Sequence, residues 1–325
     1  MKLTLTKKIL MAIALLTMAT VALIAAGSYQ PPFGGWKRVS DKPVLGPNGD
    51  FVGVFNPAVV KRDSEFFMLT RSQNKAGTSF LVAATSKDGV HFTSGDVVLR
   101  PEADYEKNGG VEDPRLVLIG GTYYLTYTGY NTKDAQLCLA TSKDLKQWQR
   151  EGVILPAYKG NWNVGWTKSG AILTEKVNGK YWMYFLGTGP DKRDETGLAS
   201  STDLIHWTEE TKTPALPKRL GNWDSRVVEP GPPPVMTKDG IVLIYNGADD
   251  KLVYRTGWAL FDKKDPRKLL ARSEQPIFVP EHDWEKIGQV PNVVFVEGLV
   301  REGKRWLFYY GGADKYIGVA EAESR

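Results

Sequence analysis

One pattern recurs five times along this chain of 325 residues, and it constrains the fold more than any other feature. Each copy has two short apolar runs joined by a tight turn, as in residues 115–118 and 123–127 around Gly120-Gly121. Other copies turn at Asn178-Gly179 and Asp239-Gly240, which are dipeptides that favour two-residue β-hairpins. Three copies also end in a strand, a Ser/Asp turn and an aromatic residue. The chain is therefore a series of short antiparallel strand groups.

Four-stranded units in series predict an all-β fold, a five-bladed β-propeller. The last unit is one strand short, because the chain ends at Arg325 soon after its third strand. We expect an N-terminal strand within residues 36–45 to close the last blade and cover its edge. The prediction is a single catalytic domain over residues 28–325, although the length admits two domains.

The N-terminus has the pattern of an export signal. Lys2, Lys7 and Lys8 precede an apolar run over residues 9–26, and small residues follow. This pattern predicts a signal peptide over residues 1–27 and an exported protein, periplasmic or extracellular. The run is long, so an uncleaved N-terminal membrane anchor is the alternative. With cleavage, we expect no stable membrane contact.

Charge and cysteine content exclude several function classes. The formal charge is +5, and it falls to +2 when the three lysines of the predicted signal are removed. The remaining basic residues are scattered, so we expect no nucleic-acid partner. Cys138 is a lone cysteine in a strand-like run and is predicted to be buried. The three histidines lack metal-ligand spacing and no cofactor motif occurs, so we expect no metal and no cofactor.

Polar residues stand where the innermost strand of each predicted blade begins. This set comprises Asn56, Glu112-Asp113, Lys168-Ser169, Glu229 and Glu297. In a propeller these positions converge on one mouth, and carboxylates that face each other across a cleft suit glycoside hydrolysis. One acid protonates the leaving oxygen, and one base activates water. Taken singly, each acid has a plain alternative as a turn residue or an ion-paired structural group.

Five stretches match motifs of one known family, in order along the chain. They are residues 55–58, 110–115, 222–225, 231–234 and 309–314. The Glu-Asp-Pro-Arg and Gly-Pro-Pro-Pro blocks are the most specific of them. On these motifs the chain resembles glycoside hydrolase family 130, five-bladed propellers that act on β-mannosides as hydrolases or as phosphorylases.

Within that resemblance, the chain is similar to the hydrolase-type branch. The phosphorylases carry His-Arg-Pro where this chain has Phe185-Leu186-Gly187, and tend to carry Tyr-His-Gly where it has Tyr245-Asn246-Gly247. A phosphate nucleophile needs such cations and donors. The phosphorylases also lack acids at the places of Glu229 and Glu297, which a hydrolase needs to deprotonate water.

The resemblance implies an inverting, exo-acting glycosidase that releases mannose from β-mannosides, with β-1,2-linked mannose as the expected substrate. Asp113 would be the general acid, acting through a sugar hydroxyl, and Glu229 and Glu297 would activate water. The implied substrate-binding residues are Asn56, Arg71, Arg115, Lys168, Tyr245 and Asp314.

Three alternatives stay open. The first is a β-mannoside phosphorylase. The second is another five-bladed glycosidase of the arabinosidase or xylosidase type, which usually has an Asp early in the first blade, where Asn56 stands here. The third is a non-catalytic glycan-binding propeller, which would not need acids in three blade mouths. The oligomeric state is not predicted.

Overall fold

The computed structural model describes residues 29–325, so the predicted signal peptide over residues 1–27 lies outside the described residues. Within residues 29–325 the protein is all-β except for the one-turn helix α2 (Asp283–Lys286). In that range no helix has the length and apolar character needed to cross a membrane.

The strands form five antiparallel groups in chain order. The first group is β2 (Phe51–Arg62), β3 (Glu65–Asn74), β4 (Ser79–Ser86) and β5 (Thr93–Leu99). The second is β6 (Gly110–Ile119), β7 (Thr122–Tyr130), β8 (Ala135–Ser142) and β9 (Gln149–Leu155). The third is β10 (Thr167–Val177), β11 (Lys180–Thr188), β12 (Asp194–Ser201) and β13 (Thr208–Glu209). The fourth is β14 (Val227–Pro230), β15 (Val235–Met236), β16 (Ile241–Ala248), β17 (Tyr254–Phe261) and β18 (Leu269–Arg272). The fifth is β19 (Val294–Glu302), β20 (Arg305–Gly312) and β21 (Tyr316–Glu323), joined by β1 (Lys37–Arg38).

The N-terminal strand completes the last group. β1 pairs antiparallel with β21, with Lys37 opposite Glu321 and Arg38 opposite Ala320. The prediction that a strand within residues 36–45 pairs with the last unit is therefore confirmed. This pairing covers the outer edge of β21, which would otherwise present unpaired N–H and C=O groups.

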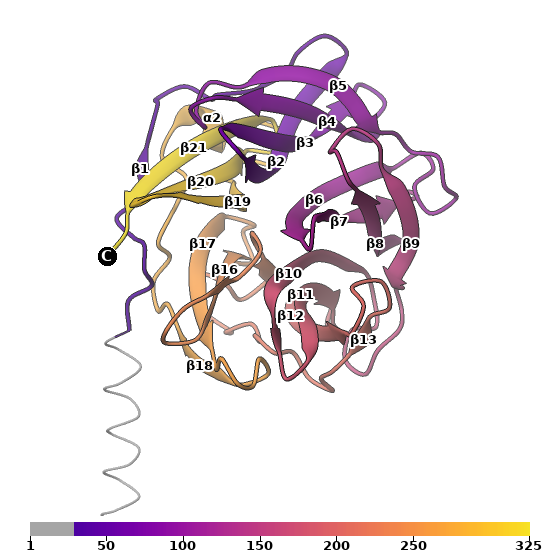
Figure 1. Ribbon diagram of the computed structural model, residues 1–325, viewed down its shortest axis with the longest axis vertical. Helices are drawn as coiled ribbons and strands as arrows, with labels where there is room; N and C mark the ends of the chain where they lie inside the picture. Colours follow the sequence, from indigo (N-terminus) through magenta and orange to yellow (C-terminus); the bar gives the residue numbers. More distant parts are fainter. Residues whose placement is uncertain (1–28) are drawn as a thin grey trace, which may run out of the picture.

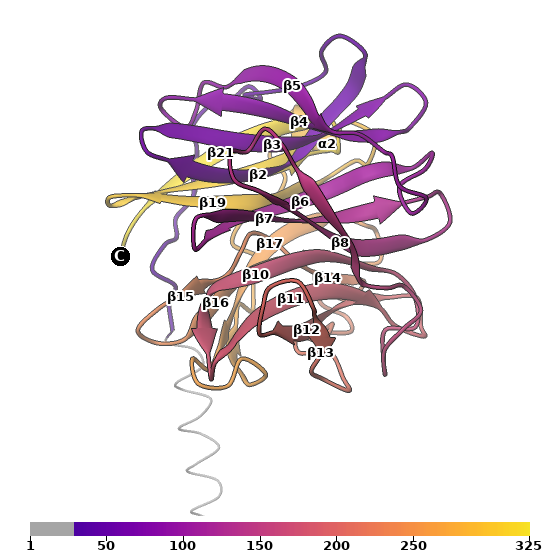
Figure 2. The same ribbon diagram turned by 45° about the vertical axis from the view of Figure 1, so that its right-hand side comes forward.

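The five groups lie side by side around the centre of the molecule (Figure 1). The first strands of neighbouring groups are in contact: β2 with β6, β6 with β10, β10 with β14, and β19 with β2. Figures 1 and 2 both show the last group, in yellow, beside the first, in indigo. Within residues 29–325 no single sheet closes on itself. The groups meet through these first strands, and short parallel pairings of β4 with β6 and of β12 with β14 join the first group to the second and the third to the fourth.

Two of the three predicted hairpin turns are two-residue turns, at Gly120-Gly121 and Asn178-Gly179; the third spans residues 237–240, because β15 and β16 pair Met236 with Ile241. Gly120 and Gly121 have φ of 57° and 74°, and Asn178 and Gly179 have 54° and 78°. Two successive left-handed residues give the turn that matches the twist of a β-hairpin. Between the groups lie clusters of buried apolar side chains, and Cys138 is buried in one of them, as predicted.

A buried cluster of the same composition occurs in three of the groups. In each, an acidic residue from the segment that leads into the group binds a Tyr of its second strand and an Arg of its outermost strand. The three Tyr–acid–Arg clusters are Glu106–Tyr127–Arg150, Asp224–Tyr245–Arg272 and Glu285–Tyr310–Arg38. All three acids are fully buried, so the clusters fix each incoming segment to its group. In the last group, Arg38 comes from the N-terminal strand.

Candidate active site

A cavity at the centre receives side chains from all five groups. Its lining residues are Asn56, Arg71, Asp113, Lys168, Glu229, Tyr254, Val290, Val293, Phe295 and Asp314. The structure thus brings together six of the nine predicted site residues. The three that do not line the cavity are Arg115, Tyr245 and Glu297.

Bulges in the first strands aim several of these side chains. The register shifts in β2 between Phe55 and Pro57, and comparable shifts interrupt β6, β10 and β19. Asn56, Asp113 and Ser169 lie at three of these bulges with φ of 50°, 49° and 59°. A bulge turns a side chain out of the regular alternation of a strand. The bulges of β2 and β6 therefore turn Asn56 and Asp113 towards the cavity.

Asp113 is bound to two donors in the cavity. Its Oδ1 accepts hydrogen bonds from Asn56 Nδ2 at 2.7 Å and from Arg71 Nη1 at 2.9 Å. Burial alone raises its pKa, but the cations Arg71 and Lys168 outweigh burial and lower the pKa of Asp113 to about 2. Asp113 is therefore ionised at neutral pH when the cavity is empty. A role as general acid requires a bound sugar to weaken its contact with Arg71.

Arg71 is fixed in one orientation by its neighbours. Its Nη2 donates to Glu112 Oε1 at 2.6 Å, its Nε donates to Ser79 Oγ at 3.0 Å, and its guanidinium lies 4.9 Å from the centre of the Phe55 ring. Ser79 Oγ also donates to Glu112 Oε1 at 3.0 Å. Arg71 therefore presents a fixed donor to Asp113. Glu112 belongs to the Glu-Asp-Pro-Arg block, yet no catalytic or substrate-binding role was predicted for it.

Glu229 is the second carboxylate of the cavity. Its Oε1 accepts a short hydrogen bond from Ser169 Oγ and lies 3.9 Å from Lys168 Nζ. Burial raises the pKa of Glu229, against the opposing effect of Lys168. Burial likewise raises the pKa of Asp314 to about 6. The cavity carboxylates therefore differ in pKa, and Asp113, whose pKa is lowest, is the one most firmly held in the ionised form.

Glu297 and Arg115 form a buried pair outside the cavity lining. Arg115 Nη1 lies 2.7 Å from Glu297 Oε1, and both side chains are almost fully buried. Neither Glu297 oxygen accepts a hydrogen bond of favourable geometry, since Arg115 aims its donors at the carbonyls of Asp113, Pro230 and Gly231. Burial raises the pKa of Glu297 well above its usual range. Arg115 thus supports the backbone beside the cavity and does not reach into it, against the prediction.

Tyr245 lies in the core and not in the cavity, against the prediction. Its hydroxyl donates to Asp224 Oδ2 at 2.9 Å, and its ring stacks on Trp223 at 5.4 Å. The side chain is fully buried. Tyr245 points away from the centre because it belongs to one of the three Tyr–acid–Arg clusters.

Four lining residues were missed by sequence reasoning: Tyr254, Val290, Val293 and Phe295. Val290 and Val293 come from the connection that precedes β19, which carries no motif. A backbone hydrogen bond from Tyr254 N to Asn292 O at 3.0 Å holds this connection to β17. Hydrophobic periodicity cannot reveal such a pairing. Within residues 29–325 no group of three or more His, Cys, Asp or Glu side chains could hold a metal ion.

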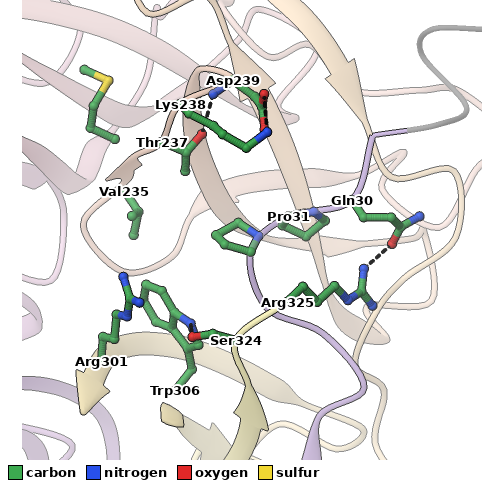
Figure 3. A pocket seen from close by; sticks show the side chains of 12 residues that line it. Gln30, Pro31, Val235, Thr237, Lys238, Asp239, Arg301, Trp306, Ser324 and Arg325 are labelled. Atoms are coloured by element: carbon green, nitrogen blue, oxygen red, sulfur yellow. Dashed lines mark hydrogen bonds and ion pairs between the residues drawn. The ribbon is translucent and has the colours of Figure 1, made fainter. Parts of the chain in front are cut away.

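One larger hollow at the rim lacks the chemistry of the central cavity. It has a volume of about 560 Å³ and lies near the two ends of the described chain, between the turn at residues 237–239 and Trp306 (Figure 3). Its lining holds one acidic side chain, Asp239, which pairs with Lys238 at 3.1 Å. No second carboxylate of its lining faces Asp239, so we place the candidate site in the central cavity.

Comparison with known proteins identifies the family of this chain. A family model for glycoside hydrolase family 130, described as beta-1,4-mannooligosaccharide phosphorylase, matches residues 33–325. Two curated relatives come from Thermoanaerobacter sp.: a 1,2-beta-oligomannan phosphorylase (39% identical, 89% of this chain and 97% of the relative) and a beta-1,2-mannobiose phosphorylase (35%, 88% and 96%).

A solved structure is 33% identical with a TM-score of 0.82, covering 91% of this chain and 98% of its own. It is described as showing that the GH130 family of mannoside phosphorylases contains glycoside hydrolases that target beta-1,2 mannosidic linkages in Candida mannan. Both the family model and the relatives extend over nearly all of the described residues. The chain belongs to glycoside hydrolase family 130.

Proposed function

We propose that this chain is an inverting, exo-acting glycosidase that releases mannose from β-mannosides, with β-1,2-linked mannose as its substrate and water as the nucleophile. The β-1,2 linkage is supported by the names of the curated relatives. It is also supported by the description of the solved structure, which names glycoside hydrolases that target beta-1,2 mannosidic linkages. The observation that carries the choice of water is the carboxylate of Glu229, which lines the cavity, accepts a hydrogen bond from Ser169 and lies 3.9 Å from Lys168 Nζ.

The charge of the cavity favours water over phosphate. Its lining holds three carboxylates, from Asp113, Glu229 and Asp314, and two cations, from Arg71 and Lys168. Arg71 already binds Asp113 and Glu112, and Lys168 lies nearest Glu229. A phosphate dianion would therefore meet three like charges with both cations engaged. A water molecule meets no such repulsion and gains a base in Glu229.

In the proposed mechanism, Asn56, Arg71 and Asp314 bind the terminal mannose. A sugar hydroxyl enters between Arg71 and Asp113 and raises the pKa of Asp113, which takes up a proton from solvent as the sugar binds. Asp113 then gives this proton to the sugar hydroxyl, and the hydroxyl passes its own proton to the leaving oxygen. Glu229 takes a proton from the attacking water on the opposite face of the ring. Glu297 lies behind the lining, and we assign it a supporting role, in which its contact with Arg115 fixes the position of that side chain.

A β-mannoside phosphorylase is the second candidate. The names of the curated relatives favour it over the hydrolase, because both are phosphorylases. Lys168 and Arg71, both in the cavity lining, supply the two cations on which an anion could be held.

We further propose that the five strand groups are the blades of a closed five-bladed β-propeller. A propeller closes through contacts between separate sheets, so a sheet that closes on itself is not expected. We also propose that residues 1–27 direct export of the chain and are then removed. The mass of the mature N-terminus, measured on protein from the native host, tests the second proposal.

The test of the function is incubation with β-1,2-, β-1,3- and β-1,4-mannobiose, with and without phosphate, while product anomers are followed by NMR. The proposal predicts α-mannose from the β-1,2-linked sugar in both buffers. Release of α-mannose 1-phosphate only when phosphate is present would establish the second candidate. Binding of the sugars without turnover would favour the non-catalytic propeller.

A further inference from the structure

The exposed aromatic side chains of this protein are gathered in one place. The chain has 10 Trp, 14 Tyr and 12 Phe, and nearly all of those described are buried or half-buried. Within residues 29–325 the only exposed ones are Tyr158, at 59% exposure, and Trp166, at 37%. Val164, at 48%, lies between them in the sequence. An exposed apolar patch of this kind marks a surface that binds something.

The Trp166 ring is held in place although it is exposed. Its indole N–H donates to Lys133 O at 3.2 Å, and its ring meets Tyr130 edge to face at 5.8 Å. Backbone bonds from Gly165 N to Thr188 O at 3.0 Å and from Thr188 N to Trp166 O at 3.1 Å fix the segment. A ring that is already ordered loses little entropy when a ligand covers it.

The patch lies at the cavity end of the strands. Trp166 directly precedes β10, and Lys168, two residues on, lines the cavity. Tyr130 ends β7 and pairs with Gly110, which begins β6, the strand that carries Asp113 into the cavity. The aromatic side chains therefore flank the mouth between the second and third strand groups.

We propose that Tyr130, Tyr158 and Trp166 form a stacking platform for the sugar rings that lie beyond the cleaved linkage, so that the chain acts on oligomannosides longer than a disaccharide. This inference rests on the proposed function and extends it from the terminal mannose to the rest of the substrate. The face of a pyranose ring carries C–H groups that pack on an aromatic ring, while its hydroxyls remain in water. Tyr and Trp suit such a surface because each has an apolar body and a polar tip.

The experiment measures calorimetrically the affinity of β-1,2-mannobiose and β-1,2-mannotetraose for Asp113→Asn protein, in which turnover is suppressed. With the platform intact, the tetraose should bind about tenfold tighter than the disaccharide, the gain of one stacked ring. Trp166→Ala should remove this gain and leave the disaccharide within about twofold. Trp166→Tyr should retain most of it. Leu118→Ala, an exposed apolar residue at the far end of β6, is the matched control and should change neither affinity.

Each other outcome overturns a different statement. Equal affinity of the two sugars, or an equal loss of both in Trp166→Ala, would contradict the platform and leave the proposed function intact. Binding of neither sugar by protein with Trp166 intact would contradict the proposed function itself. If Trp166→Ala converts a dimer into a monomer with unchanged tetraose affinity, the patch is an interface between copies and the platform is refuted.

Discussion

Replacing Arg38 by Met tests how the N-terminal strand is attached to the fold. Arg38 is nearly buried and donates to Glu285 from Nε at 2.7 Å and from Nη2 at 2.8 Å, to Glu281 at 2.8 Å and to Val279 O at 2.7 Å. Met fills the space of the aliphatic stem but leaves the fully buried Glu285 without its cation. Breaking a buried pair in this way costs about 3–5 kcal/mol of the free energy of unfolding.

The loss should depend on pH in a defined direction. Burial alone raises the pKa of Glu285, but the bonds from Arg38 and from the backbone lower it below its usual range. Ionised Glu285 therefore contributes stability above the unfolded pKa of about 4.3, and this contribution is lost as pH falls through the folded pKa. In Arg38→Met the same carboxyl is buried without a cation, so its pKa rises and it is protonated more readily. The difference between wild type and variant is largest near neutral pH and shrinks towards pH 4.

Urea unfolding followed by tryptophan fluorescence at pH 7 and at pH 4.5 measures this difference. The control is Arg267→Met, which removes an exposed pair with Asp265 at 2.7 Å and should leave stability unchanged at both pH values. If Arg38→Met is as stable as Arg267→Met, or if its loss is the same at both pH values, the argument is refuted. The β1 strand would then be held by its backbone pairing alone.

Three further predictions concern the site. Asp113→Asn and Glu229→Gln should each lower the rate of mannobioside turnover by at least about 10²-fold, the usual range for acid–base groups, and full activity of Asp113→Asn would remove it from the mechanism. Mannose affinity, measured by calorimetry, should weaken as pH falls through about 6, because Asp314 then takes a proton and loses an acceptor site. Asp314→Asn should abolish this pH dependence, and an unchanged dependence would assign it to another group. Tyr245→Phe should leave the KM within about twofold while lowering the free energy of unfolding by about 1–2 kcal/mol, since it removes a buried hydrogen bond; a large rise in KM would return Tyr245 to the site.

The strand groups could be predicted from the sequence because hairpin turns and strand alternation are local signals. The pairs Gly120-Gly121 and Asn178-Gly179 mark their hairpins through residues that tolerate positive φ. The pairing of β1 with β21 was also predictable, since the last unit lacked a strand. These features depend on neighbouring residues and on counting strands.

The parts of the site that were missed depend on distant contacts. Asp113 and Glu229 were predicted from their place at the start of an inner strand, which the repeat defines. Tyr245 was predicted from the family resemblance alone; it lies within β16, where Asp224 from the preceding segment binds its hydroxyl in the core. No local pattern reveals that pairing, nor that Val293 lines the cavity. The charge of Asp113 likewise follows from Arg71, 42 residues away in the sequence.

The account depends most on water as the nucleophile, and one measurement tests it directly. The rate of β-1,2-mannobiose consumption is measured in phosphate-free buffer and then over a titration with inorganic phosphate. With Glu229 as the base, the rate without phosphate should be full, and added phosphate should leave it unchanged and yield no mannose 1-phosphate. A rate that is negligible without phosphate, and that rises to saturation with it as mannose 1-phosphate forms, would contradict the account and identify a phosphorylase.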